Sequence, residues 1–272
     1  MNYIEEMFGL NDKIVVITGG GGVIARAMSE ALLNSGAKVV LWDIKEENIN
    51  EAKDDLGKKT NCQDNIFGFV VDTMNEGSVK KAIIEVEKSA GAPNVLINAA
   101  GGNRGKSAFV DTDMETFEFV LKLNLVAGLM VPTKEMAKYW INKGMKGSII
   151  NMTSMSSYIP LSGIWAYDAA KSAVLNLTMA TAKEFAQNGI RVNAIAPGFF
   201  IGKQNKDLLI KNEATGELTD RGNDVINHTP FGRFGDVSEL AGAAIFLISD
   251  KASGFVTGVS LPVDGGYLVD NI

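Results

Sequence analysis

The feature that most constrains the fold is an alternation of short, continuously apolar runs with longer stretches of helical periodicity. The apolar runs are Lys13–Ile17, Ala37–Trp42, Ile66–Val71, Asn94–Asn98, Ser148–Met152, Arg191–Ile195 and Val259–Pro262. Helices are expected at about Val23–Leu33, Glu46–Leu56, Glu76–Ala90, Met114–Lys143, Ile164–Gln187 and Val237–Leu247. A strand that is apolar on both sides has both faces buried, and an intervening helix lets successive strands run parallel. The pattern therefore predicts a doubly wound α/β fold, with a central parallel sheet of about seven strands and helices on both faces.

One stretch breaks this alternation. No linker rich in Pro, Ser or Gly and no repeat divides the chain, so we expect one domain over residues 1–272. Residues 198–230 are polar, charged and only weakly helical. Long irregular insertions in compact domains often carry binding functions, so this insertion is expected to act as a lid, with a plain surface excursion as the alternative.

Composition excludes several classes of function. The net charge of -6 and a pI near 5.0 leave no basic excess to neutralise the phosphates of a nucleic acid. The single cysteine, Cys62, cannot form an intramolecular disulfide or a multi-thiolate metal site, and no other ligand spacing predicts a metal. No apolar stretch approaches the roughly 20 residues needed to span a bilayer, and Met1–Leu10 lacks a signal-like run. We therefore expect a soluble, cytoplasmic protein with no membrane or nucleic-acid partner.

A glycine-rich turn follows the first strand. Its sequence is Thr18-Gly19-Gly20-Gly21-Gly22-Val23, and a helix starts at once. Glycines let the backbone approach a pyrophosphate, and the helix start presents free N–H groups to it. About 20 residues on, Asp43 ends the second strand, where a carboxylate accepts hydrogen bonds from ribose hydroxyls and repels a 2′-phosphate. The pair predicts NAD in preference to NADP, with Asp43 as an N-cap of the next helix as the alternative.

Four polar residues predict a catalytic cluster. Tyr167 and Lys171 lie four apart and thus on one helix face, where an ammonium favours the phenolate and lowers the tyrosine pKa. Ser154 lies just past the fifth strand, at the edge of a parallel sheet where ligands bind. Asn124 interrupts an apolar helical stretch, and a buried Asn needs partners, so either a structural bond or a proton relay must explain it.

These motifs, with Val71-Asp72, Asn98-Ala99-Ala100-Gly101, Pro197-Gly198 and Leu261-Pro262-Val263-Asp264-Gly265-Gly266, occur in order over about 250 residues. The chain thereby resembles the short-chain dehydrogenase/reductase family. The resemblance implies a Rossmann-type fold, hydride transfer between NAD(H) and a carbonyl, and a homotetramer. It implies that Tyr167 is the general acid/base, that Ser154 binds the reacting oxygen, and that Lys171 binds the nicotinamide ribose and shifts the Tyr167 pKa. Asn124 would hold a water in the proton relay.

The same resemblance implies a cofactor site. Its residues would be Thr18, Gly19, Gly21, Gly22, Val23, Ile24, Asp43, Asp72, Thr73, Asn98, Ala99, Gly101, Tyr167, Lys171, Pro197, Gly198 and Phe200. Two departures from the family pattern stand out. Val23 and Ala25 replace glycines of the phosphate loop, which predicts an altered loop path, and no Ser or Thr follows Pro197-Gly198 to bind the carboxamide.

Several segments resemble the D-mannonate oxidoreductase (fructuronate reductase) subgroup, among them residues 19–23, 99–103, 196–200 and 228–235. The subgroup implies reduction of D-fructuronate to D-mannonate with NADH, and the reverse. A uronate needs a cation and several polar groups. The candidates are Asn103, Arg104, Ser156, Gln204, His228 and Arg233, although Arg233 could instead pin the insertion to the core. The alternatives are a gluconate 5-dehydrogenase-like polyol oxidoreductase, a 3-oxoacyl reductase, and a nucleotide-binding scaffold without turnover.

Overall fold

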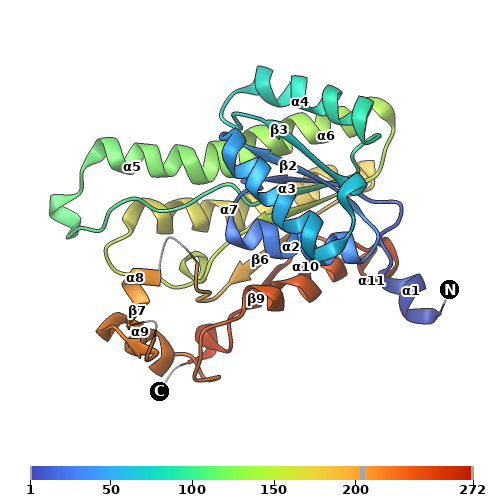
Figure 1. Cartoon of the computed structure of the whole chain (residues 1–272). Coiled ribbons are helices and arrows are strands. Elements are labelled where there is room, and N and C mark those ends of the chain that lie inside the picture. Colours follow the sequence, from blue (N-terminus) through green and yellow to red (C-terminus); the bar gives the residue numbers. More distant parts are fainter. Residues whose placement is uncertain (1, 203–205, 213, 271–272) are drawn as a thin grey trace.

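A sheet of seven parallel strands forms the centre of the computed structural model, which describes residues 2–202, 206–212 and 214–270 (Figure 1). The strands are β1 Ile14–Thr18, β2 Lys38–Asp43, β3 Ile66–Val70, β4 Val95–Asn98, β5 Gly147–Met152, β6 Ile190–Pro197 and β9 Ser260–Val263. Their order across the sheet is β3-β2-β1-β4-β5-β6-β9, and every neighbouring pair is parallel. The order reverses between β1 and β4, and ligands of such sheets bind at the carboxyl ends beside that point. The predicted fold class is confirmed.

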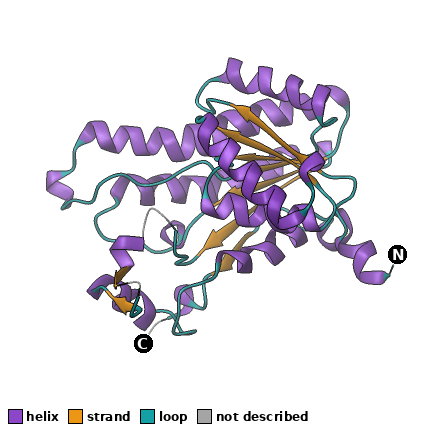
Figure 2. Ribbon diagram, viewed as in Figure 1, coloured by secondary structure: helices purple, strands orange, loops and turns teal. Residues whose placement is uncertain are grey.

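Helices cover both faces of this sheet, as Figure 2 shows. On one face pack α2 Val23–Asn34, α3 Glu46–Thr60 and α10 Ala241–Ile248, and on the other α4 Glu76–Ser89, α6 Val131–Lys143 and α7 Trp165–Phe185. The remaining helices are α1 Tyr3–Phe8, α5 Met114–Leu121, α8 Lys206–Leu209, α9 Asp220–Asn227 and α11 Asp250–Ser253. Along β1, Val15 and Ile17 enter one core while Val16 enters the other, because successive side chains of a strand point to opposite faces. In the described part of the chain, no helix is long and apolar enough to cross a membrane.

The helix predicted over Met114–Lys143 is continuous but changes its winding. Between α5 and α6, residues Lys122–Met130 form a π-helix, and Asn124 lies within it. π-Helical turns are rare and occur often at functional sites. The wider turn brings Gly128 against the segment after β4, where a Cβ would lie 2.6 Å from the carbonyl oxygen of Ala100. The close approach therefore requires a glycine at this position.

The insertion after β6 contains more regular structure than its sequence indicates. Besides α8 and α9 it holds a small antiparallel pair, β7 Ile210–Asn212 with β8 Glu217–Leu218. Figure 1 places these elements beyond the carboxyl end of β6, at the lower left of the view. The insertion thus lies at the carboxyl edge of the sheet, where the catalytic candidates also lie.

Candidate active site

The turn between β1 and α2 is tight because its glycines contact neighbouring segments. Gly19 has a φ of +64°, and a Cβ on it would lie 2.9 Å from the Ala100 Cα. The Gly22 N–H donates to the Gly19 carbonyl over 2.9 Å and closes the turn. Val23 is the first residue of α2, and Ala25 is buried in the core beneath it. Gly19 to Gly22 therefore make the turn, and Val23 and Ala25 occupy ordinary helical positions where glycine is not needed.

The Asp43 carboxylate faces this turn from the end of β2. Its Oδ2 accepts the Gly21 N–H at 3.1 Å, and its Oδ1 accepts the Lys45 N–H at 3.1 Å and the Asn48 amide at 3.0 Å. The N-cap of α3 is Lys45, so the alternative that Asp43 caps this helix is wrong. A carboxylate fixed beside the glycine turn can accept hydrogen bonds from the hydroxyls of an adenosine ribose, and the helix start that follows the turn suits the pyrophosphate of a dinucleotide.

A cleft of about 500 Å³ opens between the glycine turn, Asp43 and the segment after β4. Of the predicted cofactor residues, Gly19, Gly21, Gly22, Val23, Ile24, Asp43, Ala99, Gly101 and Phe200 line it. Other lining residues were not predicted from the sequence, namely Ala25, Arg26, Asn48, Glu51, Ala100, Ile201, Gly202 and Val237. Asn48 and Glu51 could have been predicted as cleft residues from the sequence, because they lie on the helix that directly follows Asp43. Val237 comes from a distant segment, and no feature of the sequence indicates that it lies at the cleft.

Several predicted cofactor residues lie beneath or beside the cleft and not in its lining. Thr18 is fully buried, and its Oγ1 accepts the N–H groups of Ala99 at 3.1 Å and Ala100 at 3.0 Å. The Asn98 amide donates to Thr133 and to Asn151, both at 2.8 Å. These side chains hold the backbone that borders the cleft.

The other predicted cofactor residues outside the lining are Tyr167 and Lys171, which belong to the catalytic cluster described below, and Asp72, Thr73, Pro197 and Gly198. Asp72 follows β3, and its Oδ1 accepts the N–H of Met74 at 2.9 Å. Gly198 follows β6 and donates to the Val263 carbonyl at 2.9 Å, which ties the end of β6 to β9. A Cβ on Gly198 would lie 2.6 Å from the Asp264 Cα, so this crossing requires glycine.

Three of the four catalytic candidates come together at the carboxyl end of β5. Ser154 follows β5, and Tyr167 and Lys171 lie on α7. The Ser154 hydroxyl lies beside the Tyr167 phenol, close enough to lower its pKa by hydrogen bonding. The Lys171 Nζ lies 5.6 Å from the centre of the Tyr167 ring and donates to the Met152 carbonyl at 2.7 Å. The arrangement can deliver two hydroxyl donors to one oxygen, with an ammonium beside them.

Burial dominates the electrostatics of this cluster. It lowers the pKa of Lys171 to about 8. It also raises the pKa of Tyr167, while the hydrogen bond from Ser154 lowers it and the neighbouring Asp168 carboxylate raises it. We expected Lys171 to lower the Tyr167 pKa. This expectation is wrong, because desolvation of the phenolate is the largest effect and raises the pKa.

The fourth candidate, Asn124, has its side chain engaged by the backbone. It is fully buried, and its Nδ2 donates to the carbonyls of Gly102 at 2.7 Å and Val120 at 2.9 Å. Its Oδ1 accepts the Gly102 N–H at 3.0 Å. Of the two alternatives, a structural bond accounts for this amide. A Cβ on Gly101 would lie 2.7 Å from the Asn124 Oδ1 and 3.7 Å from the Lys171 Nζ, so Asn124 and Lys171 flank the same glycine.

Comparison with known proteins agrees with this geometry. A family model described as enoyl-(acyl carrier protein) reductase matches residues 21–268. An uncharacterised oxidoreductase of Haemophilus influenzae is 38% identical, with 97% of this chain and 96% of the relative covered. The chain belongs to the short-chain dehydrogenase/reductase family. It is thus an oxidoreductase that acts on CH–OH groups with NAD or NADP, and the scaffold alternative is set aside.

Other members of this dehydrogenase/reductase family refine the picture. A solved structure described as a candidate D-mannonate oxidoreductase from Haemophilus influenzae, with bound NAD, is 36% identical; the match covers 99% of both chains with a TM-score of 0.87. A gluconate 5-dehydrogenase from Burkholderia cenocepacia, in complex with NADP and tartrate, is 31% identical with a TM-score of 0.86, covering 98% of this chain and 99% of that one. The gluconate 5-dehydrogenase of Gluconobacter oxydans is 32% identical, covering 97% and 98%.

In this dehydrogenase/reductase, two substrate candidates line a cavity of about 180 Å³ beside the start of α7. These are Asn103 and Arg104, and Trp165 and Ala166 of α7 line the same cavity. The Arg104 guanidinium stacks on the Phe119 ring, 4.4 Å from its centre. The segment is fastened to α7 because the Trp165 indole donates to the Ser107 carbonyl at 3.2 Å. Lys106, which the sequence analysis missed, lines the same cavity.

The other substrate candidates are engaged elsewhere. Arg233 makes an exposed bidentate pair with Glu239, six residues further along the chain, at 2.8 and 2.7 Å; the alternative that it pins the insertion to the core stays a prediction. His228 contacts the Asp224 carbonyl within its own helix. Ser156 is buried, and its Oγ has no hydrogen-bond partner among the described residues. Gln204 lies outside the described residues.

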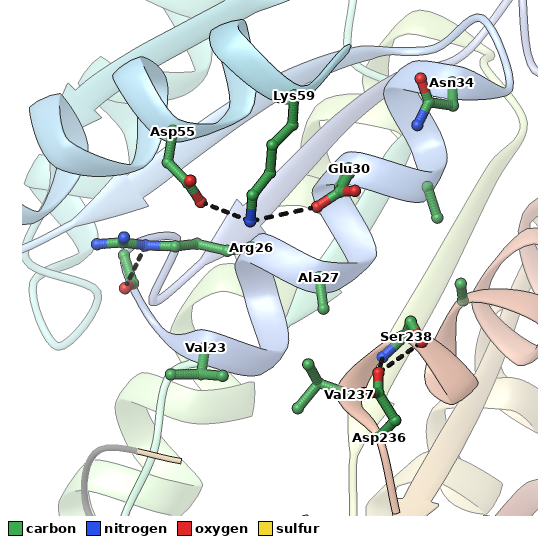
Figure 3. Close-up of a pocket in the computed structure, with 13 residues that line it drawn as sticks. Val23, Arg26, Ala27, Glu30, Asn34, Asp55, Lys59, Asp236, Val237 and Ser238 are labelled. Carbon is green, nitrogen blue, oxygen red and sulfur yellow. Dashed lines mark hydrogen bonds and ion pairs between the residues drawn. The ribbon is translucent and has the colours of Figure 1, made fainter. Parts of the chain in front are cut away.

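A second hollow lies on the outer side of α2 (Figure 3), with a volume of about 550 Å³. It shares Gly21, Val23, Arg26 and Val237 with the cofactor cleft. Its lining holds two cations, Arg26 and Lys59, against three carboxylates, and Lys59 pairs with Asp55 at 3.1 Å and with Glu30 at 3.6 Å. The hollow therefore offers little net charge to a phosphate or carboxylate ligand.

Proposed function

We propose that this enzyme interconverts D-fructuronate and D-mannonate, with NADH and NAD as its cofactors. The observation that carries the proposal is the cavity between Arg104, Lys106 and the start of α7, which adjoins the catalytic helix. Both cations lack an ion-pair partner among the described residues, although Asp111 and Asp113 line the same cavity. A sugar acid presents one carboxylate and several hydroxyls, which match a guanidinium, an ammonium and nearby amides. The likeness to a candidate D-mannonate oxidoreductase supports the same substrate.

We assign the chemistry to Tyr167, Ser154 and Lys171. When bound, the nicotinamide supplies or accepts the hydride. The Tyr167 hydroxyl donates a proton to the oxygen formed in reduction and withdraws it in oxidation. The Ser154 hydroxyl hydrogen-bonds the same oxygen as it gains negative charge. Lys171 binds the nicotinamide ribose, and Asn124 holds the segment after β4 against the π-helix Lys122–Met130 through Gly102.

We assign a preference for NAD to Asp43. Its carboxylate is held at the cleft by three hydrogen-bond donors, and the charge opposes a 2′-phosphate. The NAD in the Haemophilus influenzae structure supports this preference, whereas relatives of similar identity carry NADP.

The test is an assay of NADH and NADPH oxidation with D-fructuronate, 5-keto-D-gluconate, D-fructose and a 3-oxoacyl ester. The proposal expects the highest kcat/KM with D-fructuronate and NADH. A higher kcat/KM with 5-keto-D-gluconate would favour the alternative, a gluconate 5-dehydrogenase, which the similar relatives support. Preference for the oxoacyl ester would contradict both sugar-acid assignments.

We also propose a cytoplasmic homotetramer whose insertion, residues 198–230, closes over bound substrate as a lid. The exposed apolar side chains of Met130, Ile141 and Met179, on the long helices, support a contact between copies. Light scattering behind size-exclusion chromatography tests the tetramer. For the lid, NADH with D-mannonate is expected to slow tryptic cleavage after the exposed Lys211, and an unchanged cleavage rate would contradict it.

A further inference from the structure

One hydroxyl group joins the two segments that carry the catalytic residues. Ser157 ends the short 3-10 turn Met155–Ser157 that follows β5. Its Oγ accepts the backbone N–H of Ser154 at 3.2 Å and donates to the backbone carbonyl of Lys171 at 2.8 Å. The second bond spans 14 residues of sequence and reaches from the turn to α7. A side chain that is itself outside the reaction thus touches the main chain of Ser154 and of Lys171.

The direction of these bonds is unambiguous. A serine hydroxyl has one hydrogen to donate and two lone pairs to accept. A carbonyl can only accept and an amide N–H can only donate, so the Ser157 hydroxyl must donate to Lys171 and accept from Ser154. The Ser154 Oγ in turn accepts the Ser156 N–H at 3.2 Å, which leaves the Ser154 O–H to donate to the phenol or to a reacting oxygen.

The turn packs directly against α7, and side-chain hydrogen bonds fix how the two segments are aligned. The chain connects them through residues 158–164, of which Tyr158, Ile159 and Pro160 are exposed. The Lys171 ammonium provides one further link through the Met152 carbonyl. That link depends on a long flexible side chain, whereas the Ser157 bond joins main chain to main chain through a single Cβ.

We propose that Ser157 is a positioning residue, which holds Ser154 in register with Tyr167 and Lys171 during proton transfer. The reaction requires the Ser154 and Tyr167 hydroxyls to meet at one oxygen, and displacement of a reacting group by about 1 Å costs on the order of 100-fold in rate. The role concerns the proton transfer common to the family and is independent of the proposed substrate.

The simpler explanation is that Ser157 only caps the turn. A cap contributes to stability and leaves the chemistry of the folded enzyme unchanged. The two explanations differ in whether kcat and its pH dependence change in a protein that is fully folded and binds cofactor normally.

The test compares Ser157→Ala, Ser157→Cys and Ser157→Thr with the full-length wild type. Ser172→Ala is the matched control, because Ser172 is exposed on α7 next to Lys171 and its side chain makes no hydrogen bond to the catalytic cluster among the described residues. The substrate is D-fructuronate with NADH or, if the wild type does not reduce it, whichever ketone of the panel it does reduce. The readouts are kcat, KM, the pH profile of kcat/KM, NADH affinity by fluorescence, and Tm.

The expected result for Ser157→Ala is a fall in kcat of at least about tenfold, with KM and NADH affinity within about threefold of wild type. The pH limb assigned to Tyr167 should move to higher pH, because the hydrogen bond from Ser154 lowers the Tyr167 pKa and would be weakened. Ser157→Cys, with a weak S–H donor of similar shape, should show the same loss, and it carries the test if the alanine variant does not fold. Ser157→Thr keeps the hydroxyl and should retain most of the activity.

Three results would overturn the proposal. The first is a folded Ser157→Ala or Ser157→Cys variant with the kcat and pH profile of the wild type. The second is a Ser157→Thr variant as impaired as the alanine variant, which would point to packing in place of the hydrogen bond. The third is a loss of kcat of the same size in Ser172→Ala.

Discussion

The side-chain ammonium of Lys171 donates a hydrogen bond to the backbone carbonyl of Met152, with 2.7 Å between Nζ and oxygen. This contact fastens α7 to the end of β5 and holds a charge in a buried position. Burial lowers the pKa of Lys171 to about 8, so the residue required beside Tyr167 is held there at a cost in stability.

The first prediction concerns the pH dependence of stability. The unfolded chain keeps a proton on Lys171 up to its ordinary pKa of 10.5, whereas the folded chain releases it at about 8. Between these values the unfolded state binds more protons, so the contribution of Lys171 to the free energy of unfolding rises with pH, by about 1.4 kcal/mol per unit. Below about pH 8 both states are protonated, and the cost of the buried charge is fully present.

The measurement is urea unfolding of wild type and Lys171→Met at about pH 7 and about pH 10. The free energy of unfolding of wild type minus that of the variant should increase by roughly 2 kcal/mol over this range. The lost hydrogen bond to Met152 adds an offset that does not depend on pH. A difference that stays constant would contradict the lowered pKa.

The second prediction concerns Tyr167. Tyr167→Phe removes the proton donor and should lower kcat by about 10²–10⁴-fold, the usual contribution of a general acid/base. NADH affinity should stay within about threefold, as measured by fluorescence titration. The matched control is Tyr158→Phe, which removes an exposed hydroxyl that donates only to the Ser260 carbonyl. A Tyr167→Phe enzyme that keeps more than a tenth of the wild-type kcat would exclude the assigned role.

The third prediction concerns cofactor choice. Asp43→Asn keeps the size of the side chain but removes its charge, so the 2′-phosphate is no longer repelled. The ratio of kcat/KM for NADH to that for NADPH should fall at least tenfold, about 1.4 kcal/mol. Asp55→Asn, on α3 and outside the cofactor cleft, serves as the control. If the ratio does not change, Asp43 does not select the cofactor.

The fourth prediction concerns Thr18. Thr18→Ala leaves the N–H groups of Ala99 and Ala100 without their shared acceptor, next to the cofactor cleft. The free energy of unfolding should fall by about 1–3 kcal/mol in urea denaturation, and NADH affinity should fall as well. Thr18→Ser retains the acceptor and should keep the wild-type NADH affinity. Equal losses in both variants would implicate the methyl group and not the hydroxyl.

Some of the site could be predicted from sequence because it is local. The glycine turn needs glycine at Gly19 through a positive φ, and Asp43 ends a strand whose neighbour in the sheet ends in that turn. Tyr167 and Lys171 share one helix face through their spacing alone. Each of these inferences requires only short-range geometry and the known edge of a parallel sheet.

Other parts depended on segments far apart in sequence. Asn98 belongs to the motif at the end of β4, yet its amide binds Thr133 and Asn151, 35 and 53 residues away. Arg233 is as polar as any substrate ligand, and only its contact with Glu239 shows that it is engaged elsewhere. The π-helical winding at Asn124 has no signature in the apolar pattern that predicts the helix around it.

The parallel sheet, the order of the motifs and the residue types available for proton transfer follow from the sequence, because hydrophobic periodicity and short spacings are properties of the chain alone. The chemical behaviour of those residues depends on how distant segments pack around them. The pKa values of Tyr167 and Lys171 depend on how much water the fold removes around them, and burial raises the first and lowers the second. The Ser157 hydroxyl likewise links Ser154 to Lys171 only once β5 and α7 are packed together, because these two residues are far apart in the sequence.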